Sequence, residues 1–255
     1  MRRVKIVVSY DGTNFFGYQV QPNARTVQGE LQRALGKIHK SSSWPITASG
    51  RTDTGVHSLG QTIHFDTPLN IPEDRWKRAI NAVVPDDIVV VEGSYVREDF
   101  HARYHTVGKE YIYRVNTGKE KNVFTRNYSY HLREELCRDA MLEGANHLLG
   151  THNFTSFSSP RTAVVDKVRT IYNLSITNEG AEWTFRYVGS GFLYQMVRIL
   201  TGTLLEIGKG NMDPLEIPHI IKGEDRALAG PTIPGCGLYL SKVVYSEGDL
   251  ANLLK

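Results

Sequence analysis

The strongest constraint on the fold is the order in which predicted strands and helices follow one another. In the first part of the chain, apolar runs and two-residue alternation predict strands, and apolar residues at helical spacing predict helices. These segments are, in order, strand 4–9, helix 26–40, strands 45–49 and 61–66, helix 72–84 and strand 87–95. This order is the split β-α-β arrangement of a ferredoxin-like unit.

The second part of the chain repeats the same order. Its predicted segments are strand 107–116, helix 134–149, strands 167–177 and 182–188, helix 192–207, a small helix 214–222 and strand 237–244. We therefore expect an α+β fold with two ferredoxin-like halves, whose antiparallel sheets are covered by helices on one face and meet at a central cleft. The expected domains are residues 1–104 and residues 105–255, with the boundary in residues 97–106.

Composition agrees with a globular protein that has substantial cores. The chain has 255 residues, of which 40% are hydrophobic and 22% charged. No apolar stretch approaches the ~20 residues of a membrane-spanning helix, and the basic, then apolar, first residues favour a strand over a signal peptide. Cys137 and Cys236 lack the spacing of metal ligands or of a disulfide framework, which favours a reducing cytoplasm.

Positive charge is slight overall and concentrated locally. The net charge is +3 at a sequence pI of about 8.7. One cluster lies between Arg97 and Lys109, and a second lies between Arg161 and Arg169. Such clusters are often only solvated surface, but near aromatic residues they also indicate nucleic-acid binding.

The segment Gly50-Arg51-Thr52-Asp53-Thr54-Gly55-Val56-His57 lies between two predicted strands. An ordinary turn would explain its glycines and its aspartate. A turn explains less well why so many functional groups gather there, with Gln61 and His64 following. On the residues alone, Asp53 can be either a turn residue or a catalytic carboxylate.

This segment resembles the signature of the tRNA pseudouridine synthase A (TruA) family. Further blocks of the chain resemble that family in the same order: residues 9–12 with 16–19, residues 26–31, the tyrosine strand at 109–113 and the helix at 191–198. The resemblance covers most of the chain.

The resemblance implies an isomerase that converts uridine to pseudouridine at positions 38, 39 and 40 of the tRNA anticodon stem-loop. By motif position, Asp53 is the nucleophile, Arg198 keeps Asp53 charged through an ion pair, and Tyr111 stacks on the base or relays a proton. Tyr113 suits a core position better. The further residues expected to bind substrate are Arg51, Gln61 and Lys109. Family members are homodimers, so a homodimer is expected, with the tRNA lying across both subunits.

The chemistry of this reaction requires neither a metal nor a cofactor, since no atom is lost and no redox change occurs. A carboxylate attacks uracil C6 or ribose C1′, and the sequence leaves both routes open. Two other functions also stay open. One is a non-catalytic RNA-binding protein of the same fold, and the other is a metal-dependent phosphodiesterase that uses Asp53, His57 and His64.

Overall fold

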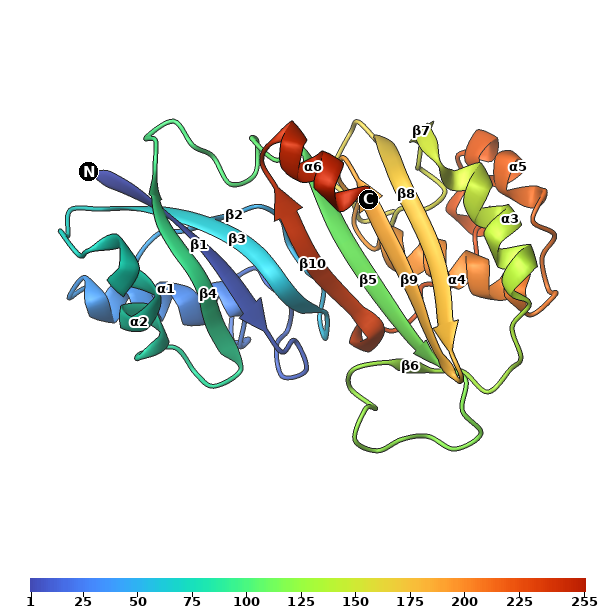
Figure 1. The fold of residues 1–255 in the computed structure, drawn as a ribbon, viewed down its shortest axis with the longest axis horizontal. Coiled ribbons are helices and arrows are strands. Elements are labelled where there is room, and N and C mark those ends of the chain that lie inside the picture. The colour runs from blue at the N-terminus through green and yellow to red at the C-terminus, as the bar shows by residue number, and fades with distance from the viewer. The chain divides into compact units, whose positions relative to one another are not determined.

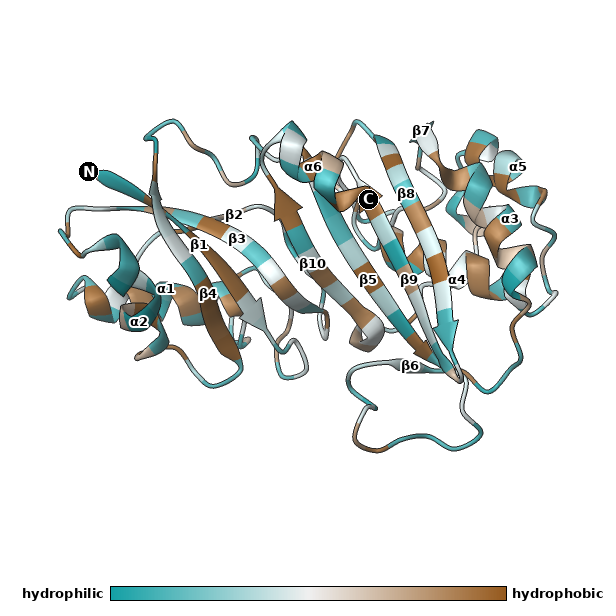
Figure 2. Cartoon of the chain, in the orientation of Figure 1, coloured by the Kyte–Doolittle hydropathy of each residue, from teal (hydrophilic) through white to brown (hydrophobic).

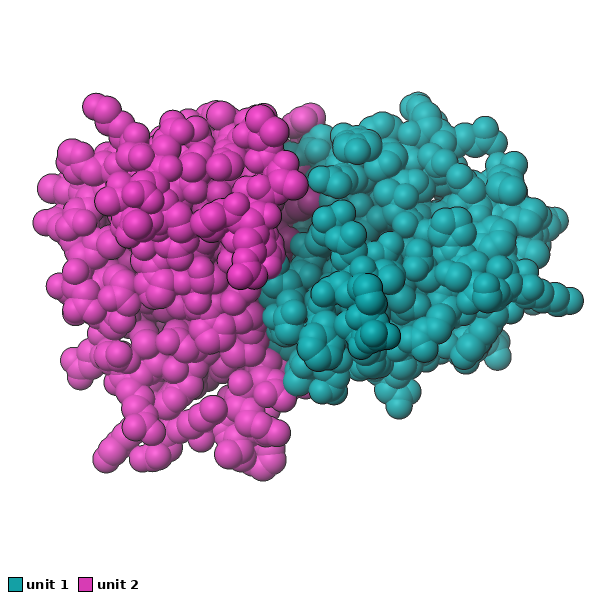
Figure 3. All heavy atoms as spheres, turned by 180° about the vertical axis from the view of Figure 1, so that it is seen from behind, with its two compact units in different colours: residues 1–107, 239–246 teal, residues 108–238, 247–255 magenta.

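The computed structural model describes residues 1–255 and divides into two compact units, which Figure 3 colours separately. Unit 1 contains Met1–Val107 and Tyr239–Ser246, and unit 2 contains Gly108–Leu238 and Glu247–Lys255. The first change of unit lies close to the expected boundary after residue 104. Residues 239–246 differ from the expectation, because they cluster with unit 1 although the predicted order of elements groups them with the second half.

Unit 1 is a mixed sheet with two helices (Figure 1). Its elements are β1 (Arg2–Tyr10), α1 (Val27–Ile38), β2 (Thr47–Ala48), β3 (His57–Thr67), the 3-10 turn Glu73–Arg75, α2 (Trp76–Asn81), β4 (Ile88–Val96) and β10 (Leu238–Val244). The strand order is β4-β1-β3-β10, with β2 paired to β3. β1 is antiparallel to both β3 and β4, whereas β10 runs parallel to β3 and pairs Tyr239 with His57. Through this pairing the last strand joins the strands of unit 1.

The core of unit 1 lies between one face of this sheet and the two helices. Ile6 of β1 pairs with Ile63 of β3, and both are fully buried. Leu31 and Leu35 of α1 and Trp76 of α2 are buried in the same cluster. Both helices therefore cover one face of the sheet, as the alternating burial of β1 requires.

Unit 2 has its own helices, and its strands are antiparallel to their neighbours apart from β6. Its elements are β5 (Gly108–Asn116), β6 (Tyr130–His131), α3 (Arg138–Leu148), β7 (Gly150–Asn153), β8 (Val168–Glu179), β9 (Glu182–Gly189), α4 (Met196–Gly208), α5 (Glu216–Gly223), the 3-10 turns Arg226–Leu228 and Gly235–Gly237, and α6 (Glu247–Leu253). The strand order is β5-β9-β8-β7, and β6 pairs with β5 in parallel. The α+β class is thus confirmed. The second half departs from the expected β-α-β-β-α-β order, because it contains the additional short strands β6 and β7 and its last strand, β10, clusters with unit 1.

The central helix of unit 2 is apolar on nearly every side. Almost all residues of α4 are buried, and hydrophobic colour dominates its ribbon in Figure 2. A Cβ atom on Gly202 would lie 2.0 Å from the Pro231 carbonyl oxygen, so glycine is needed for this close approach. Such a helix is typical of a core element. No helix in the structure combines the length and hydrophobicity needed to span a membrane.

Several elements differ from their predicted bounds. The helix predicted at 192–207 begins at Met196, because Gln195 adopts a left-handed backbone conformation with φ 62°. The strand predicted at 61–66 is longer and begins at His57. The short strands β6 and β7 and the helix α6 are not predicted, since two to seven residues carry too little periodicity.

Candidate active site

Asp53 lies in the loop that joins β2 to β3 in unit 1, and residues 10–18 hold this loop in place. The Tyr10 hydroxyl and Thr52 Oγ1 are hydrogen-bonded at 2.8 Å, and the Tyr18 amide donates to the Thr52 carbonyl oxygen at 3.0 Å. Thr52 is buried and Asp53 is half-buried. Thr52, the residue before Asp53, is therefore fixed through both its side chain and its backbone.

Two glycines allow residues 10–18 to approach the Asp53 loop this closely. A Cβ atom on Gly12 would lie 2.0 Å from the Val56 carbonyl oxygen. Gly17 has φ +89°, and a Cβ atom there would lie 3.0 Å from the Thr52 carbonyl oxygen. Larger residues would collide with the loop or strain their own backbone. In the sequence these glycines stand out only as part of a resemblance, and their role in seating the loop is not predicted.

Gln61 of β3 holds the start of the same loop. Its side chain is fully buried, where its amide oxygen accepts from Ser49 Oγ at 2.6 Å and its amide nitrogen donates to the Gly50 carbonyl oxygen at 3.0 Å. Both ends of the Gln61 amide are thus engaged with the loop. The sequence predicts that Gln61 contacts the substrate, whereas in the structure its amide bonds the Asp53 loop.

His57, the last residue of the motif, is buried at the start of β3. Its Nδ1 accepts from the Gly12 amide at 3.0 Å, and Asp11 Oδ1 lies 3.2 Å from the same nitrogen. The ring stacks on Tyr239 with centroids 4.8 Å apart. His57 therefore joins the loop to β10 within unit 1.

Arg51 and Lys109 are the other residues expected to bind substrate. Arg51 is exposed in the Asp53 loop, and its side chain makes no hydrogen bond or ion pair in the structure. Lys109 lies half-buried on β5 of unit 2, where it pairs with Gly189. The exposed guanidinium of Arg51 can reach a phosphate or a displaced base without losing an existing partner.

Tyr111 and Tyr113 lie on the same face of β5 in unit 2. The Tyr111 ring meets the Phe192 ring edge-on, with centroids 5.1 Å apart at 78°. Tyr113 is completely buried and donates from its hydroxyl to the Pro234 carbonyl oxygen at 2.6 Å. Burial raises the pKa of Tyr113 well above its usual value. Tyr113 is therefore a satisfied core residue, whereas Tyr111 packs at right angles to another ring.

Arg198 lies in the first turn of α4 and is half-buried. Its Nε donates to the Ile233 carbonyl oxygen at 2.7 Å, which fixes the plane of the guanidinium. A planar guanidinium held at Nε still directs its terminal amino groups as a fork suited to a carboxylate.

The histidines and acids of β3 have partners within unit 1 that suit a structural role. His64 Nδ1 accepts from the Ala102 amide at 3.1 Å, and Arg3 binds Asp66 through two hydrogen bonds of 2.7 Å. No group of three His, Cys, Asp or Glu side chains in the structure has the arrangement of a metal site. The geometry does not favour the phosphodiesterase alternative.

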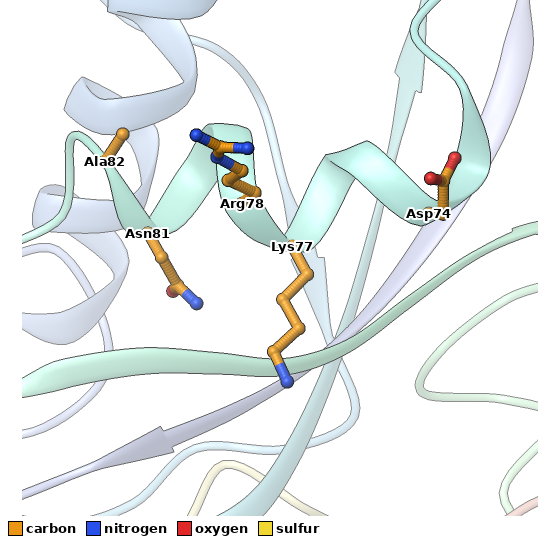
Figure 4. Close-up of a pocket in the computed structure, with 5 residues that line it drawn as sticks. All are labelled: Asp74, Lys77, Arg78, Asn81 and Ala82. Carbon is orange, nitrogen blue, oxygen red and sulfur yellow. The ribbon is translucent and has the colours of Figure 1, made fainter.

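A surface hollow lies on α2, away from the residues described above. It has a volume of about 470 Å³ and is lined by Asp74, Lys77, Arg78, Asn81 and Ala82 (Figure 4). The side chains of Lys77 and Arg78 point away from one another, and the Asn81 side chain bonds the backbone of Val90. None of the candidate catalytic residues lines this hollow.

Comparison with known proteins identifies the class to which this fold and this loop belong. The family model described as tRNA pseudouridine synthase matches residues 6–105 and 145–246, a range that includes the Asp53 loop, Arg198 and most of both units. This chain belongs to that family, which is a family of isomerases.

The relatives within the family carry a more particular name, tRNA pseudouridine synthase A. The protein of that name from Anoxybacillus flavithermus is 55% identical over 97% of this chain and 100% of its own length. Those from Halalkalibacterium halodurans and Bacillus subtilis are each 52% identical, covering 99% and 96% of this chain and 96% and 100% of their own lengths. Among solved structures, a chain from the crystal structure of a Cbf5-Nop10-Gar1 complex is only distantly similar, with a TM-score of 0.36 and 14% identity over 79% of this chain and 54% of that chain.

Proposed function

We propose that this tRNA pseudouridine synthase isomerises uridine to pseudouridine at positions 38, 39 and 40 of the anticodon stem-loop, with Asp53 as the nucleophile. The observation that carries the proposal is the Asp53 loop. It has the sequence expected of the family, and residues 10–18 immobilise it through the Tyr10 and Tyr18 contacts to Thr52. A nucleophile reacts faster when its position relative to the reacting atom is fixed before the substrate binds.

The reaction needs a nucleophile and a place for the base to turn. The Asp53 carboxylate attacks uracil C6 or ribose C1′, and the bond between N1 and C1′ breaks. The base then turns, C5 bonds to C1′, and the covalent bond to Asp53 breaks, which restores the Asp53 carboxylate. The C5 proton passes to water, and N1 gains a proton. Atoms and electrons balance, so the reaction requires no metal or cofactor. Either route is covalent catalysis by a carboxylate.

Arg198 and Tyr111 of unit 2 are proposed to complete the catalytic group. A carboxylate beside an uncharged base tends to take up a proton, and a permanently charged guanidinium opposes this. The Nε bond of Arg198 to Ile233 supports that role, because it fixes the plane of the guanidinium. The Tyr111 ring offers a surface on which an extruded uracil can stack.

The remaining residues are proposed to act on the loop or on the RNA. Gln61 supports Asp53 indirectly, since its amide bonds both Ser49 and Gly50. Arg51 is exposed beside the nucleophile and takes the place of the extruded base or binds its phosphate. Lys109 contributes positive charge beside Tyr111 on β5.

The proposed partner is the anticodon arm of tRNA, bound by a homodimer in the cytoplasm. The support is the identity to tRNA pseudouridine synthase A proteins over nearly the full chain. Phosphate contacts should make the binding strongly dependent on salt.

The decisive experiment uses unmodified tRNA that carries tritium at C5 of uridine. Pseudouridine formation releases this tritium to water, and substrates with a single uridine at position 38, 39 or 40 identify the site. Asp53→Ala should abolish release while tRNA affinity stays within about ten-fold, because phosphate contacts dominate binding.

Asp86→Ala is the matched control, since Asp86 is exposed and has no hydrogen bond or ion pair. This variant should release tritium at the wild-type rate. No release by the wild-type protein from any tRNA, beside release by an authentic synthase, would refute the proposal.

A further inference from the structure

Tyr104 presents an aromatic ring to solvent in the segment that follows β4 in unit 1. The residue is 75% exposed, which is unusual for a tyrosine. The ring stacks on the His101 ring with centroids 4.3 Å apart and planes at 27°. One face of Tyr104 is therefore supported by His101, while most of the residue remains accessible to solvent.

The backbone around Tyr104 is fixed by His101. Nδ1 of His101 accepts from the amides of Arg103 and Tyr104, at 3.2 and 3.3 Å. The His101 amide in turn donates to His105 Nδ1 at 3.3 Å. These bonds close a tight turn, so the orientation of the Tyr104 ring is set before any ligand arrives.

Ala102, between these residues, anchors the turn to the body of unit 1. It is completely buried, its amide donates to His64 Nδ1 at 3.1 Å, and its carbonyl oxygen accepts from the Tyr245 hydroxyl at 2.8 Å. Contacts from β3 and from Tyr245, the residue after β10, thus hold the turn. A ring on such a base loses little conformational freedom on binding.

The charged residues around the Tyr104 ring favour binding of a polyanion. The Arg103 guanidinium lies 5.9 Å from the Tyr104 ring centroid and makes no hydrogen bond or ion pair of its own. The neighbouring acids Asp66 and Asp99 are bound by Arg3 and Arg97. Glu98 is the one acid of this segment without such a partner.

We propose that Tyr104, supported by His101 and flanked by Arg103, is a stacking platform for an unpaired base of the tRNA substrate, outside the target uridine. The proposal rests on the proposed function for its choice of RNA. Single-stranded RNA is bound by stacking its bases on aromatic rings, with arginine contributing charge.

The turn that carries Tyr104 is anchored to β3 far from the end at which the Asp53 loop enters that strand. His64, which anchors Ala102, lies seven residues along β3 from His57, or ~23 Å at the rise of a strand. One nucleotide cannot reach both places. The base on Tyr104 therefore belongs to another part of the same RNA, and the platform helps to position the anticodon arm.

The test compares tRNA affinity for Tyr104→Leu and Tyr104→Phe in the full-length protein at one salt concentration. Leucine keeps an apolar side chain but removes the stack, so the Kd should rise roughly 10-fold. Phenylalanine keeps the ring, so the Kd should stay within about two-fold of the wild-type value. Val89→Ala, at another exposed apolar residue of unit 1, should leave the Kd unchanged.

A double-mutant cycle identifies the base that stacks on the ring. Nucleotides of the anticodon arm are replaced one at a time by abasic sites, and each RNA is measured with wild-type protein and with Tyr104→Leu. At one position outside the target uridine, the abasic site and Tyr104→Leu should together cost less binding free energy than the sum of their separate costs, since each change removes the same contact. Full additivity at every position would overturn the proposal.

Tritium release by the same proteins separates this inference from the proposed function. Release by the wild-type protein with an unchanged Kd for Tyr104→Leu would overturn the platform alone, whereas absence of release would refute the function. If Tyr104→Leu instead changes the oligomeric state in sedimentation and not the affinity per protomer, the ring contacts a second copy of the chain and the RNA proposal is wrong.

Discussion

At position 12, any side chain would meet space that the Val56 carbonyl oxygen already fills, since a Cβ atom there would lie 2.0 Å from that oxygen. Gly12→Ala must therefore move either residues 10–18 or the Asp53 loop. A displacement of about 1 Å at a catalytic group can cost roughly 100-fold in rate. We expect kcat/KM for tritium release to fall by about that factor.

Gly210→Ala is the control for the effect of a glycine replacement as such. Gly210 has φ +77°, and nothing lies within 4 Å of a Cβ atom there. That variant should lose roughly 1–2 kcal/mol of stability through backbone strain, yet keep its activity. Full activity in Gly12→Ala would show that the loop tolerates the shift.

Residue types and motif positions predict which side chains matter better than they predict what each one touches. Asp53 is a candidate from its motif. The sequence does not reveal that the Gln61 amide is consumed by Ser49 and Gly50, because a glutamine on a predicted strand can point to a loop as well as to a ligand. The closeness of Gly12 to Val56 is a tertiary contact, and local propensity carries no information about it.

At the scale of elements, the first turn of α1 holds residues 17 and 18 in place, and these residues in turn contact the Asp53 loop. The amides of Val27 and Gln28 donate to the carbonyl oxygens of Gly17 and Tyr18, at 3.3 and 2.9 Å. Tyr18 in turn binds the Thr52 backbone. The first turn of a helix has amides without partners inside the helix, and here they fix residues 17 and 18.

Thr26 is the N-cap of α1, and its removal should weaken that arrangement. Thr26 Oγ1 accepts from the Gly29 amide at 3.3 Å and is 2% exposed. Thr26→Ala should lower the free energy of unfolding by about 1 kcal/mol, measured by urea denaturation. Thr26→Ser keeps the acceptor and should cost less than half as much. Equal losses in both variants would mean that the methyl group, and not the cap, is responsible.

The long periodic elements of this chain could be predicted, while their ends and the short elements could not. The strand predicted at 107–116 is β5, and the cap at Thr26 is observed. The helix predicted from 192 begins at Met196, since hydropathy does not report the left-handed conformation of Gln195. Where the last strand pairs is also invisible in the sequence, because its partner β3 is far away along the chain.

At the scale of the whole molecule, His64 should make global stability depend on pH. Burial, followed by the charges of Arg3 and His101, lowers the pKa of His64 to about 4. Asp66 acts in the opposite direction, and His105 adds to the lowering. In the unfolded chain the same group has a pKa of about 6.5.

The unfolded chain therefore takes up a proton on His64 between about pH 6.5 and 4 while the folded protein does not. The stability contribution is complete above this window and is lost as the pH falls through it, by up to about 3 kcal/mol. His64→Gln should flatten the pH dependence of urea unfolding between pH 7 and 4.5. Asp66, whose pKa is lowered by its hydrogen bonds to Arg3, acts only at lower pH. Parallel curves for the two proteins would contradict this assignment.

The parallel pairing of β10 with β3 also sets an order of events during synthesis. Unit 1 begins with the first residue of the chain, but its sheet is complete only when residues 239–246 exist. At about 5–20 residues per second, the ribosome needs on the order of ten seconds to add the intervening unit 2. Throughout that time the edge of β3 that β10 will cover is unpaired, and exposed strand edges invite aggregation. During synthesis this chain is therefore most vulnerable to aggregation in unit 1.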